Sequence, residues 1–466
     1  MLIRLRIQGF KSLESADLRF GPLTVLVGPN ASGKSNMLDA INFLSRLCDL
    51  DVADAAAGVR PSAALARDAA SIFTATRDGR AETMTLTADF IVGQRVVDDF
   101  GRSGAPASTA LRYELCLRRQ PERAGAACAI VIVSEALSGI SGAELAAQLG
   151  FDAAPAFLES LHASASGQQF LSMETDDSGA LLAAAEPHGA APTRFELAAS
   201  PRTFLSTCNT IAHPTALAAR REMQRWSVMR LDMAALRRPD SLHAVPYLGA
   251  DGARLPSVLE RLNRHEAVAC SVAALVPQVA AIAIDIDQLA GTKTFHLETV
   301  RGGRIDAAAV SDGTLRLLAF SAIALDPQSD DMICIEEPEN SLHPGALRLL
   351  VGLIGDAVVD PHFAVDTDNS LRQILVVTHA PNIVQAVGID DLLVAGTYNR
   401  DGEPFSMFSP VLGSWRARTG GGAPAVGFGA LLAYLESGAG DTVDADCSNS
   451  ALRSYRNLPS MSVDGE

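Results

Sequence analysis

The sequence predicts an α/β fold in which a mixed-sheet core carries an antiparallel β lobe and a helical insertion. A short apolar run at 23–27 leads into a glycine-bearing loop and then into a helical pattern, as expected for a buried parallel strand followed by a helix. Two further short apolar runs, at 332–335 and 373–377, indicate more buried strands of the same core. Between these regions, apolar residues alternate at 84–92 and 111–117, which is typical of antiparallel strands with one buried face.

Weaker patterns fill the rest of the chain. Alternation at 3–7 predicts an opening strand, and a second strand is expected near 16–20. The remaining expectations are helices around 140–150, 215–236, 254–275, 344–358 and 428–435, strands near 129–133, 168–174, 280–286 and 392–395, and a flexible joint at 420–422 followed by a disordered acidic tail. No internal repeat and no sustained heptad pattern is present, so we expect no long coiled-coil arm.

Composition narrows the class of protein. A charged fraction of 20 % and an apolar fraction of 48 % are typical of globular proteins. The formal net charge of −16 argues against a broadly basic surface for nucleic acid. A local basic groove stays open at 220–225 and at 237–238, although a solvated helix face is the favoured interpretation of both stretches.

Cysteine usage and targeting signals point to the cytoplasm. The seven cysteines are scattered and show no C-x-x-C spacing, so neither a disulfide framework nor a zinc site is predicted. The first residues alternate apolar and basic side chains and do not form a signal peptide. The uncharged stretch at 267–284 is alanine-rich and contains Pro277, so we expect a buried helix followed by a strand and no membrane span.

The clearest motif is a loop of the form G-x-x-x-x-G-K-S that begins at Gly28. Its glycines let successive backbone N–H groups point at phosphate oxygens, and the following helix adds its positive N-terminal end. In such a loop Lys34 reaches the β- and γ-phosphates, and the Ser35 hydroxyl binds Mg²⁺. The predicted nucleotide site consists of Gly28, Pro29, Asn30, Ala31, Ser32, Gly33, Lys34, Ser35 and Asn36.

A second motif places two carboxylates directly after the apolar strand at 332–335. In most proteins an acidic pair after a strand is a solvated helix cap. In a chain that also carries a phosphate loop, one carboxylate can hold the Mg²⁺ shell and the next can polarise the water that attacks the γ-phosphate. By position, Glu336 is the predicted metal ligand and Glu337 the predicted catalytic residue.

Two further motifs gain meaning from this context. Ser311, Asp312 and Gly313 open a predicted helix just before the acidic strand, and a helix N-terminus of this kind can bind phosphate. His379 follows the strand at 373–377, where a side chain can contact the γ-phosphate. Alone, the first would be an ordinary capped helix and the second a structural histidine.

In this order the motifs resemble those of the SMC/RecF-like branch of ABC-type ATPases. Within that branch the chain is similar to single-chain "AAA family" predicted ATPases related to the ATPase part of OLD-family proteins. The resemblance covers 1–48 and 305–400 firmly and 226–304 more loosely. The residues that carry it are Ile3–Ser12, Gly28–Ser35, Asp251–Leu255, Ser311–Thr314, Glu336–Pro344, Thr378 and His379.

The resemblance implies a two-lobed P-loop head of ABC/SMC type that forms a head-to-tail homodimer around two ATP molecules and Mg²⁺. The residues acting in cis would be Lys34, Ser35, Glu336, Glu337 and His379, whereas Ser311 and Gly313 would reach the γ-phosphate bound by the partner. Two departures from the usual pattern leave the turnover rate open. Asp312 replaces a glycine of the signature, and Glu336 replaces an aspartate.

The expected domains are a discontinuous nucleotide-binding core at 1–48 and 305–412, an antiparallel β lobe with its connections at 49–140, an insertion at 141–304 and a flexible segment at 413–466. We expect an ATP-hydrolysing dimeric switch that acts on DNA or on a separate effector protein, in DNA repair or anti-phage defence. A transporter ATPase subunit and a nucleotide-dependent scaffold with little hydrolysis are the alternatives. Too few residues follow His379 for a fused nuclease domain, so any nuclease activity is expected in a separate partner.

Overall fold

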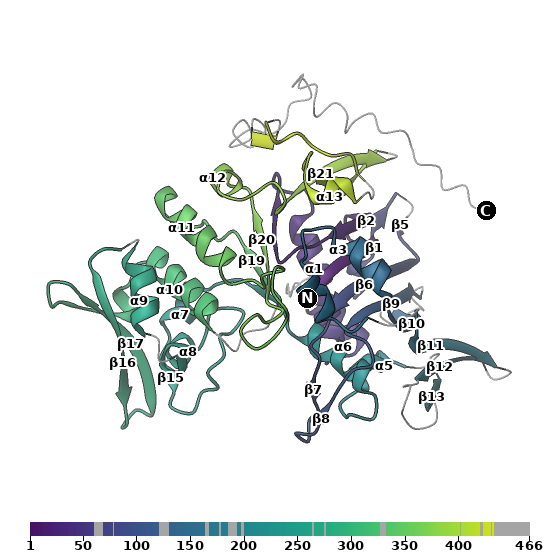
Figure 1. The fold of residues 1–466 in the computed structure, drawn as a ribbon, viewed down its shortest axis with the longest axis horizontal. Helices are drawn as coiled ribbons and strands as arrows, with labels where there is room; N and C mark the ends of the chain where they lie inside the picture. Colours follow the sequence, from purple (N-terminus) through teal and green to yellow (C-terminus); the bar gives the residue numbers. More distant parts are fainter. Residues whose placement is uncertain are drawn as a thin grey trace.

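The computed structural model describes residues 1–59, 69–77, 79–120, 130–163, 167–176, 179–184, 193–196, 200–262, 265–274, 276–326, 332–400, 402–419, 423–429 and 431–432. The chain folds into two lobes joined by a central, mostly parallel sheet (Figure 1). Ala129, the joint expected at 420–422, part of the helix expected at 428–435 and the acidic tail lie outside the described residues.

One lobe is built on a large antiparallel sheet, whose strand order is β13-β12-β11-β10-β9-β6-β1-β2. Every neighbouring pair in it is antiparallel. The alternating sequence patterns explain why these segments form strands with one buried face. The strands are β1 (Leu2–Phe10), β2 (Leu13–Arg19), β6 (Thr83–Ile91), β9 (Ala110–Arg119), β10 (Ile130–Gly139), β11 (Gln169–Asp176), β12 (Gly179–Ala184) and β13 (Thr193–Glu196).

The central sheet has the order β14-β19-β20-β3-β21-β22. All neighbours are parallel except β21 and β22, which form an antiparallel pair. Because parallel strands end at the same edge, the residues that follow β3, β14, β19 and β20 lie along one edge of the sheet. The strands are β3 (Leu23–Val27), β14 (Trp226–Met229), β19 (Met332–Glu336), β20 (Gln373–Thr378), β21 (Leu392–Arg400) and β22 (Glu403–Pro410).

The second lobe contains a small antiparallel sheet, ordered β15-β17-β16 with β18 paired to β17, and the helices packed on it. Its elements are α7 (Met233–Arg237), β15 (Asp240–Ser241), α8 (Leu255–Leu262), α9 (His265–Ala273), β16 (Val279–Asp287), β17 (Thr292–Thr299), β18 (Arg304–Asp306), η2 (Ala307–Ala309) and α10 (Asp312–Leu325). Apolar residues of α8, α9, β16, β17 and α10 share one core here.

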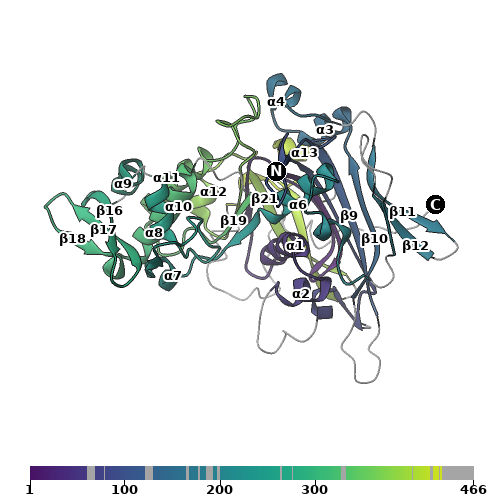
Figure 2. The ribbon, with the colours of Figure 1, turned by 90° about the horizontal axis from the view of Figure 1, so that it is seen from below.

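Helix α1 (Lys34–Leu47) lies between the antiparallel sheet and the central sheet (Figure 2). Its apolar residues Met37, Ile41 and Leu44 belong to one core with Leu5 of β1 and Leu375 of β20. The opposite face of the central sheet packs against α10 and α11 (Pro344–Gly355). The central sheet is therefore covered on both faces, which accounts for the mostly apolar sequences of its strands β3, β19 and β20.

The remaining elements are short or connect these layers. They are α2 (Val52–Ala57), η1 (Ala69–Ile72), β4 (Ala75–Thr76), β5 (Gly79–Arg80), β7 (Val96–Val97), β8 (Ser103–Gly104), α3 (Gly142–Leu149), α4 (Pro155–Glu159), α5 (Phe204–Thr207), α6 (Pro214–Gln224), α12 (Pro381–Val384) and α13 (Trp415–Arg418). No helix among the described residues combines the length and the apolar character that crossing a membrane requires.

The structure corrects two expectations. The helical pattern at 215–236 is interrupted, because β14 pairs in parallel with β19 between α6 and α7. The sheets also do not follow the expected domain boundaries. Strands from 1–48, 49–140 and 141–304 all join the antiparallel sheet, and β14 joins the central one. Strand pairing brings together segments that are distant in sequence, which local patterns do not reveal.

Candidate functional site

The loop from Gly28 to Ser35 connects β3 to α1 at the carboxyl edge of the central sheet. Gly33 is the N-cap of α1 and has a φ of 91°, a conformation that favours glycine. A side chain at Gly28 would collide with the carbonyl of Ala395, and one at Gly33 would collide with Ser406. Both glycines are therefore required for the loop to lie against β21 and β22.

Lys34 is buried and folds back over this loop. Its Nζ donates to the carbonyl oxygens of Gly28, at 2.7 Å, and Pro29, at 2.6 Å. Burial lowers the pKa of Lys34, while the carboxylates that follow β19 act in the opposite direction. The side chain thus places a positive charge within the loop, facing a group of acidic residues.

The Ser35 hydroxyl donates a 2.5 Å hydrogen bond to Oε1 of Glu336. The two residues come from the start of α1 and from the end of β19, which the sheet order places two strands away from β3. Hydroxyl and carboxylate oxygens are ligands that Mg²⁺ prefers. Ser35 and Glu336, which the sequence predicts as metal ligands, thus lie side by side, and their binding of Mg²⁺ stays a prediction.

Glu337 has a φ of 49°, an uncommon conformation for a residue with a side chain. Its backbone N–H donates to Val377 of the neighbouring strand at 2.8 Å. One carboxylate oxygen lies 3.2 Å from Nδ1 of His379, and the other accepts from Asn340 Nδ2 at 2.9 Å. The strained backbone and these two partners fix the direction of the carboxylate.

Glu339 contacts the same cluster through Thr378 and His379. Its Oε1 accepts a 2.5 Å hydrogen bond from Thr378 and lies 3.8 Å from His379. The Thr378 hydroxyl in turn accepts from the backbone N–H of Ala380 at 2.9 Å. Glu337 and Glu339 therefore contact His379 at the ends of β19 and β20.

Ser311 and Gly313 lie at the N-terminus of α10. Ser311 caps this helix by accepting from the N–H of Thr314, and Gly313 packs so closely on the next loop that a Cβ would lie 2.6 Å from the carbonyl oxygen of Ser341. In the part of the chain that the structure describes, neither residue hydrogen-bonds to the phosphate loop. Asp312 pairs with Arg237 at 2.6 Å, which offsets the negative charge that this departure adds.

Sequence patterns alone did not reveal Arg230, which directly follows β14. Its Nε donates to Oε2 of Glu336 at 3.1 Å, and its Nη2 lies 3.6 Å from the buried carboxylate of Asp39. Asp39 also accepts from Lys11 at 2.7 Å. Asp39 stands one helical turn after Ser35, a spacing that could have indicated its place beside the metal ligands.

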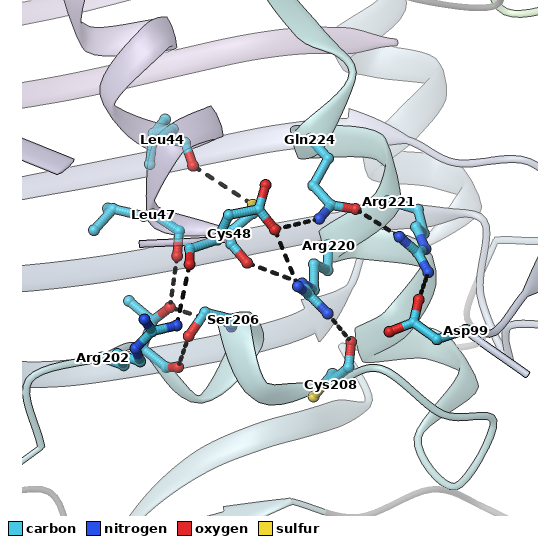
Figure 3. A network of polar contacts seen from close by, with 12 residues as sticks. Leu44, Leu47, Cys48, Asp99, Arg202, Ser206, Cys208, Arg220, Arg221 and Gln224 are labelled. Carbon is cyan, nitrogen blue, oxygen red and sulfur yellow. Dashed lines mark hydrogen bonds and ion pairs between the residues drawn. The ribbon is translucent and has the colours of Figure 1, made fainter. Parts of the chain in front are cut away.

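The stretch at 220–225, considered above as a basic groove or a solvated helix face, has a structural role instead (Figure 3). Arg220 donates to the carbonyl oxygens of Cys48 and Cys208, each at 2.9 Å, which are the C-caps of α1 and α5. Arg221 pairs with Asp99. In the second stretch, Arg237 is bound to Val310 and Asp312. The expectation of a merely solvated face is wrong for Arg220 and Arg237.

The residues present fit a magnesium-bound nucleoside triphosphate. The buried hydroxyl of Ser32, within the phosphate loop, has no hydrogen-bond partner among the described residues. Such an orphaned polar atom in a glycine-lined cradle is what a phosphate oxygen would satisfy. The loop supplies the cationic side chain of Lys34 and its backbone N–H donors. Ser35 and Glu336 supply two oxygen ligands for the metal.

Comparison with known proteins agrees with this geometry. Residues 1–178 match a family described as an AAA ATPase domain, and residues 205–385 match one described as an AAA domain, putative AbiEii toxin, type IV toxin–antitoxin system. A segment of 44 residues, 9 % of the chain, is 50 % identical to an OLD nuclease of Thermus scotoductus. One of 45 residues, also 9 %, is 49 % identical to the DNA replication and repair protein RecF of Magnetococcus marinus.

These matches span only 8 % and 12 % of the lengths of the two relatives. Among solved structures, an SMC head bound to the C-terminal winged-helix domain of ScpA aligns over 88 % of this chain and 98 % of that one, with 14 % identity and a TM-score of 0.46. An SMC head from Pyrococcus furiosus aligns over 88 % of this chain and 96 % of that one, with 11 % identity and a TM-score of 0.43.

The central sheet, the phosphate loop and the acidic strand define a P-loop fold, and the first part of the chain matches an AAA ATPase domain. The two short segments make the chain similar to an OLD nuclease and to RecF, in agreement with the resemblance of its motifs to SMC/RecF-like and OLD-family ATPases.

Proposed function

We propose that this protein binds and hydrolyses ATP with Mg²⁺ and acts as a nucleotide-gated homodimeric switch in DNA maintenance or anti-phage defence. The observation that carries the proposal is the convergence of Lys34, Ser35, Glu336, Glu337 and His379 at one edge of the central sheet. Phosphoryl transfer needs this combination of a phosphate cradle, metal ligands and an oriented base.

In this proposal each side chain has a defined task. Lys34 and the loop amides bind the phosphates, while Ser35 and Glu336 hold Mg²⁺, whose charge neutralises the phosphate oxygens. Glu337 accepts a proton from the attacking water, and its fixed orientation between His379 and Asn340 favours this role. His379 lies at the end of β20, within reach of the same phosphate edge.

The dimer is proposed from the signature helix. Ser311 and Gly313 form no hydrogen bond with their own phosphate loop among the described residues, and Ser311 is exposed. An exposed capped helix N-terminus can bind the phosphate of a second chain. ATP would then complete the interface and tighten the dimer, and hydrolysis would release it.

The DNA-directed role is proposed from the similarity of short segments to an OLD nuclease and to RecF, which is described as a DNA replication and repair protein. An alternative within the same mechanism is a switch for a separate effector or nuclease. Stimulation of ATP turnover by DNA would support the first, whereas stimulation only by a co-purifying protein would support the second.

A complementation experiment tests the shared site. Chains with Lys34→Ala and chains with Ser311→Ala should each be inactive as homodimers. Mixed in equal amounts, they form heterodimers in which one site has both residues intact, so ATP turnover should reappear. If the mixture stays as inactive as its components while both variants remain folded and the wild type is active, the shared-site dimer is wrong.

A further inference from the structure

Arg230 lies between two carboxylates at the predicted metal site. The Nε–Glu336 Oε2 distance is 3.1 Å, and the Nη2–Asp39 Oδ1 distance is 3.6 Å. Glu336 uses its other oxygen to accept the Ser35 hydroxyl. The guanidinium group therefore neutralises the same carboxylate that is expected to bind Mg²⁺.

Asp39, Glu336 and Arg230 differ in how far their side chains are exposed to solvent. The side chain of Asp39 is fully buried, that of Glu336 is 23 % exposed and that of Arg230 is 45 % exposed. A buried carboxylate next to a second carboxylate is costly without a cation nearby. Arg230 and Lys11 supply that positive charge, and Arg230 is the more exposed of the two.

The backbone at Arg230 pairs with the chain at Ala250 and Asp251, where the Asp251–Leu255 motif begins, and the proposed chemistry gives this motif no role. The N–H of Arg230 donates to the carbonyl of Ala250 at 2.8 Å, and the N–H of Asp232 donates to that of Asp251 at 2.8 Å. Gly252 turns this segment with a φ of 88°, and a Cβ there would lie 2.7 Å from a side-chain carbon of Leu236. The segment from Ala250 to Gly252 thus fixes the backbone that directly follows β14.

From these contacts we propose that Arg230 is a positioning residue that competes with Mg²⁺ for Glu336 and so sets the magnesium requirement of nucleotide binding. The inference rests on the proposed nucleotide site. A guanidinium bound to Glu336 repels a divalent cation at the same oxygens and holds the carboxylate against Ser35 until the cation displaces it. Arg230 follows β14, and β19 and β20 separate this strand from β3, which leads into the phosphate loop. The partner of Arg230 is therefore the metal ligand rather than the nucleotide.

The test is a titration of free Mg²⁺ against the binding of a fluorescent ATP analogue, repeated in EDTA. Arg230→Gln should lower the Mg²⁺ midpoint by roughly threefold or more, because one repelling charge is gone. Its affinity for the analogue in EDTA should stay within about twofold of the wild type, since Arg230 does not contact phosphate in this proposal. Arg304→Gln is the matched control, because this arginine pairs with Asp285 and Asp306 on the small sheet of the second lobe.

A second variant predicts the opposite sign. In Asp39→Asn, Arg230 keeps only Glu336 as a charged partner, and the site loses one negative charge. Both changes disfavour the cation, so the Mg²⁺ midpoint should rise. This variant also serves if Arg230→Gln does not fold. Unchanged midpoints in both variants, or a lowered melting temperature without any shift in midpoint, would show that Arg230 is merely structural and would overturn the inference. If the wild type binds no nucleotide in Mg²⁺, the proposed function itself fails.

Discussion

The carboxylate of Glu337 lies 3.2 Å from Nδ1 of His379, although 41 residues of sequence lie between them. Glu337 follows β19 and His379 follows β20, and these strands are parallel neighbours. The pair is therefore a direct result of sheet topology. It joins the predicted catalytic carboxylate to the predicted phosphate-contacting histidine.

Glu337→Gln should trap the ATP-bound dimer. Glutamine keeps the size of the side chain and can still accept from Asn340, but it cannot take a proton from water. Turnover should fall by roughly a hundredfold or more, while ATP binding persists. Light scattering with ATP should show more dimer than for the wild type. A variant that binds ATP yet stays monomeric would contradict the nucleotide-gated dimer.

Lys34→Ala should abolish productive nucleotide binding. The substitution removes the buried positive charge that faces the carboxylates after β19, and turnover should fall on the order of a hundredfold or more. Nucleotide binding by calorimetry and turnover by phosphate release measure the effect. Arg304→Ala, in the second lobe, is the control and should retain wild-type values. Undiminished turnover in Lys34→Ala would remove the phosphate loop from the mechanism.

Glu135 should make stability depend on pH. This wholly buried carboxyl accepts from the N–H groups of Phe204 and Leu205 and from the hydroxyl of Tyr113. Burial raises its pKa from 4.5 to about 7. A raised pKa in the folded state means that its stabilising contribution is complete below about pH 4.5 and is lost as the pH rises through about 7.

Comparison with Glu135→Gln measures this effect, since glutamine does not titrate. Relative to that variant, the wild type should lose roughly 3 kcal/mol of unfolding free energy between about pH 4.5 and about pH 7. Urea unfolding at several pH values gives both curves. Parallel curves across this range would show that the Glu135 carboxyl titrates normally.

Arg220→Ala should destabilise the fold. The change leaves the C-terminal carbonyls of α1 and α5 without the donors that Arg220 supplies, at a cost of about 1–3 kcal/mol. Arg221→Ala is the matched control from the same helix. It breaks a more exposed ion pair with Asp99 and should cost less than about 1 kcal/mol. Equal losses in the two variants would argue against the capping role.

The core of the candidate site could be predicted because its motifs are local. Gly28–Ser35 is a contiguous loop after an apolar strand, and Glu336, Glu337 and His379 directly follow apolar strands. Parallel strands end at one edge, so the sequence implied that these side chains would meet there. The α/β fold class predicted from these motifs is confirmed, and short segments are similar to an OLD nuclease and to RecF, as the resemblance predicted. Their individual roles remain predictions for the variants above.

Arg230 illustrates what the sequence could not reveal. It follows a strand of only four residues within a pattern that predicted a continuous helix. Its contacts with Glu336 and Asp39 exist because β14 pairs with β19, which is distant in sequence. Strand order depends on long-range pairing and on the packing of both sheet faces, and neither leaves a local signature.

The sequence by itself determined the phosphate loop and the acidic strand, because these depend on residue types at fixed short spacings. Only the tertiary structure decided which segments share the antiparallel sheet, that Arg220 caps two helices and that Arg230 shares Glu336 with Ser35. The physical reason is that each motif consists of residues adjacent in sequence. Charge partners and sheet neighbours depend instead on the burial of apolar surfaces from segments far apart in the chain.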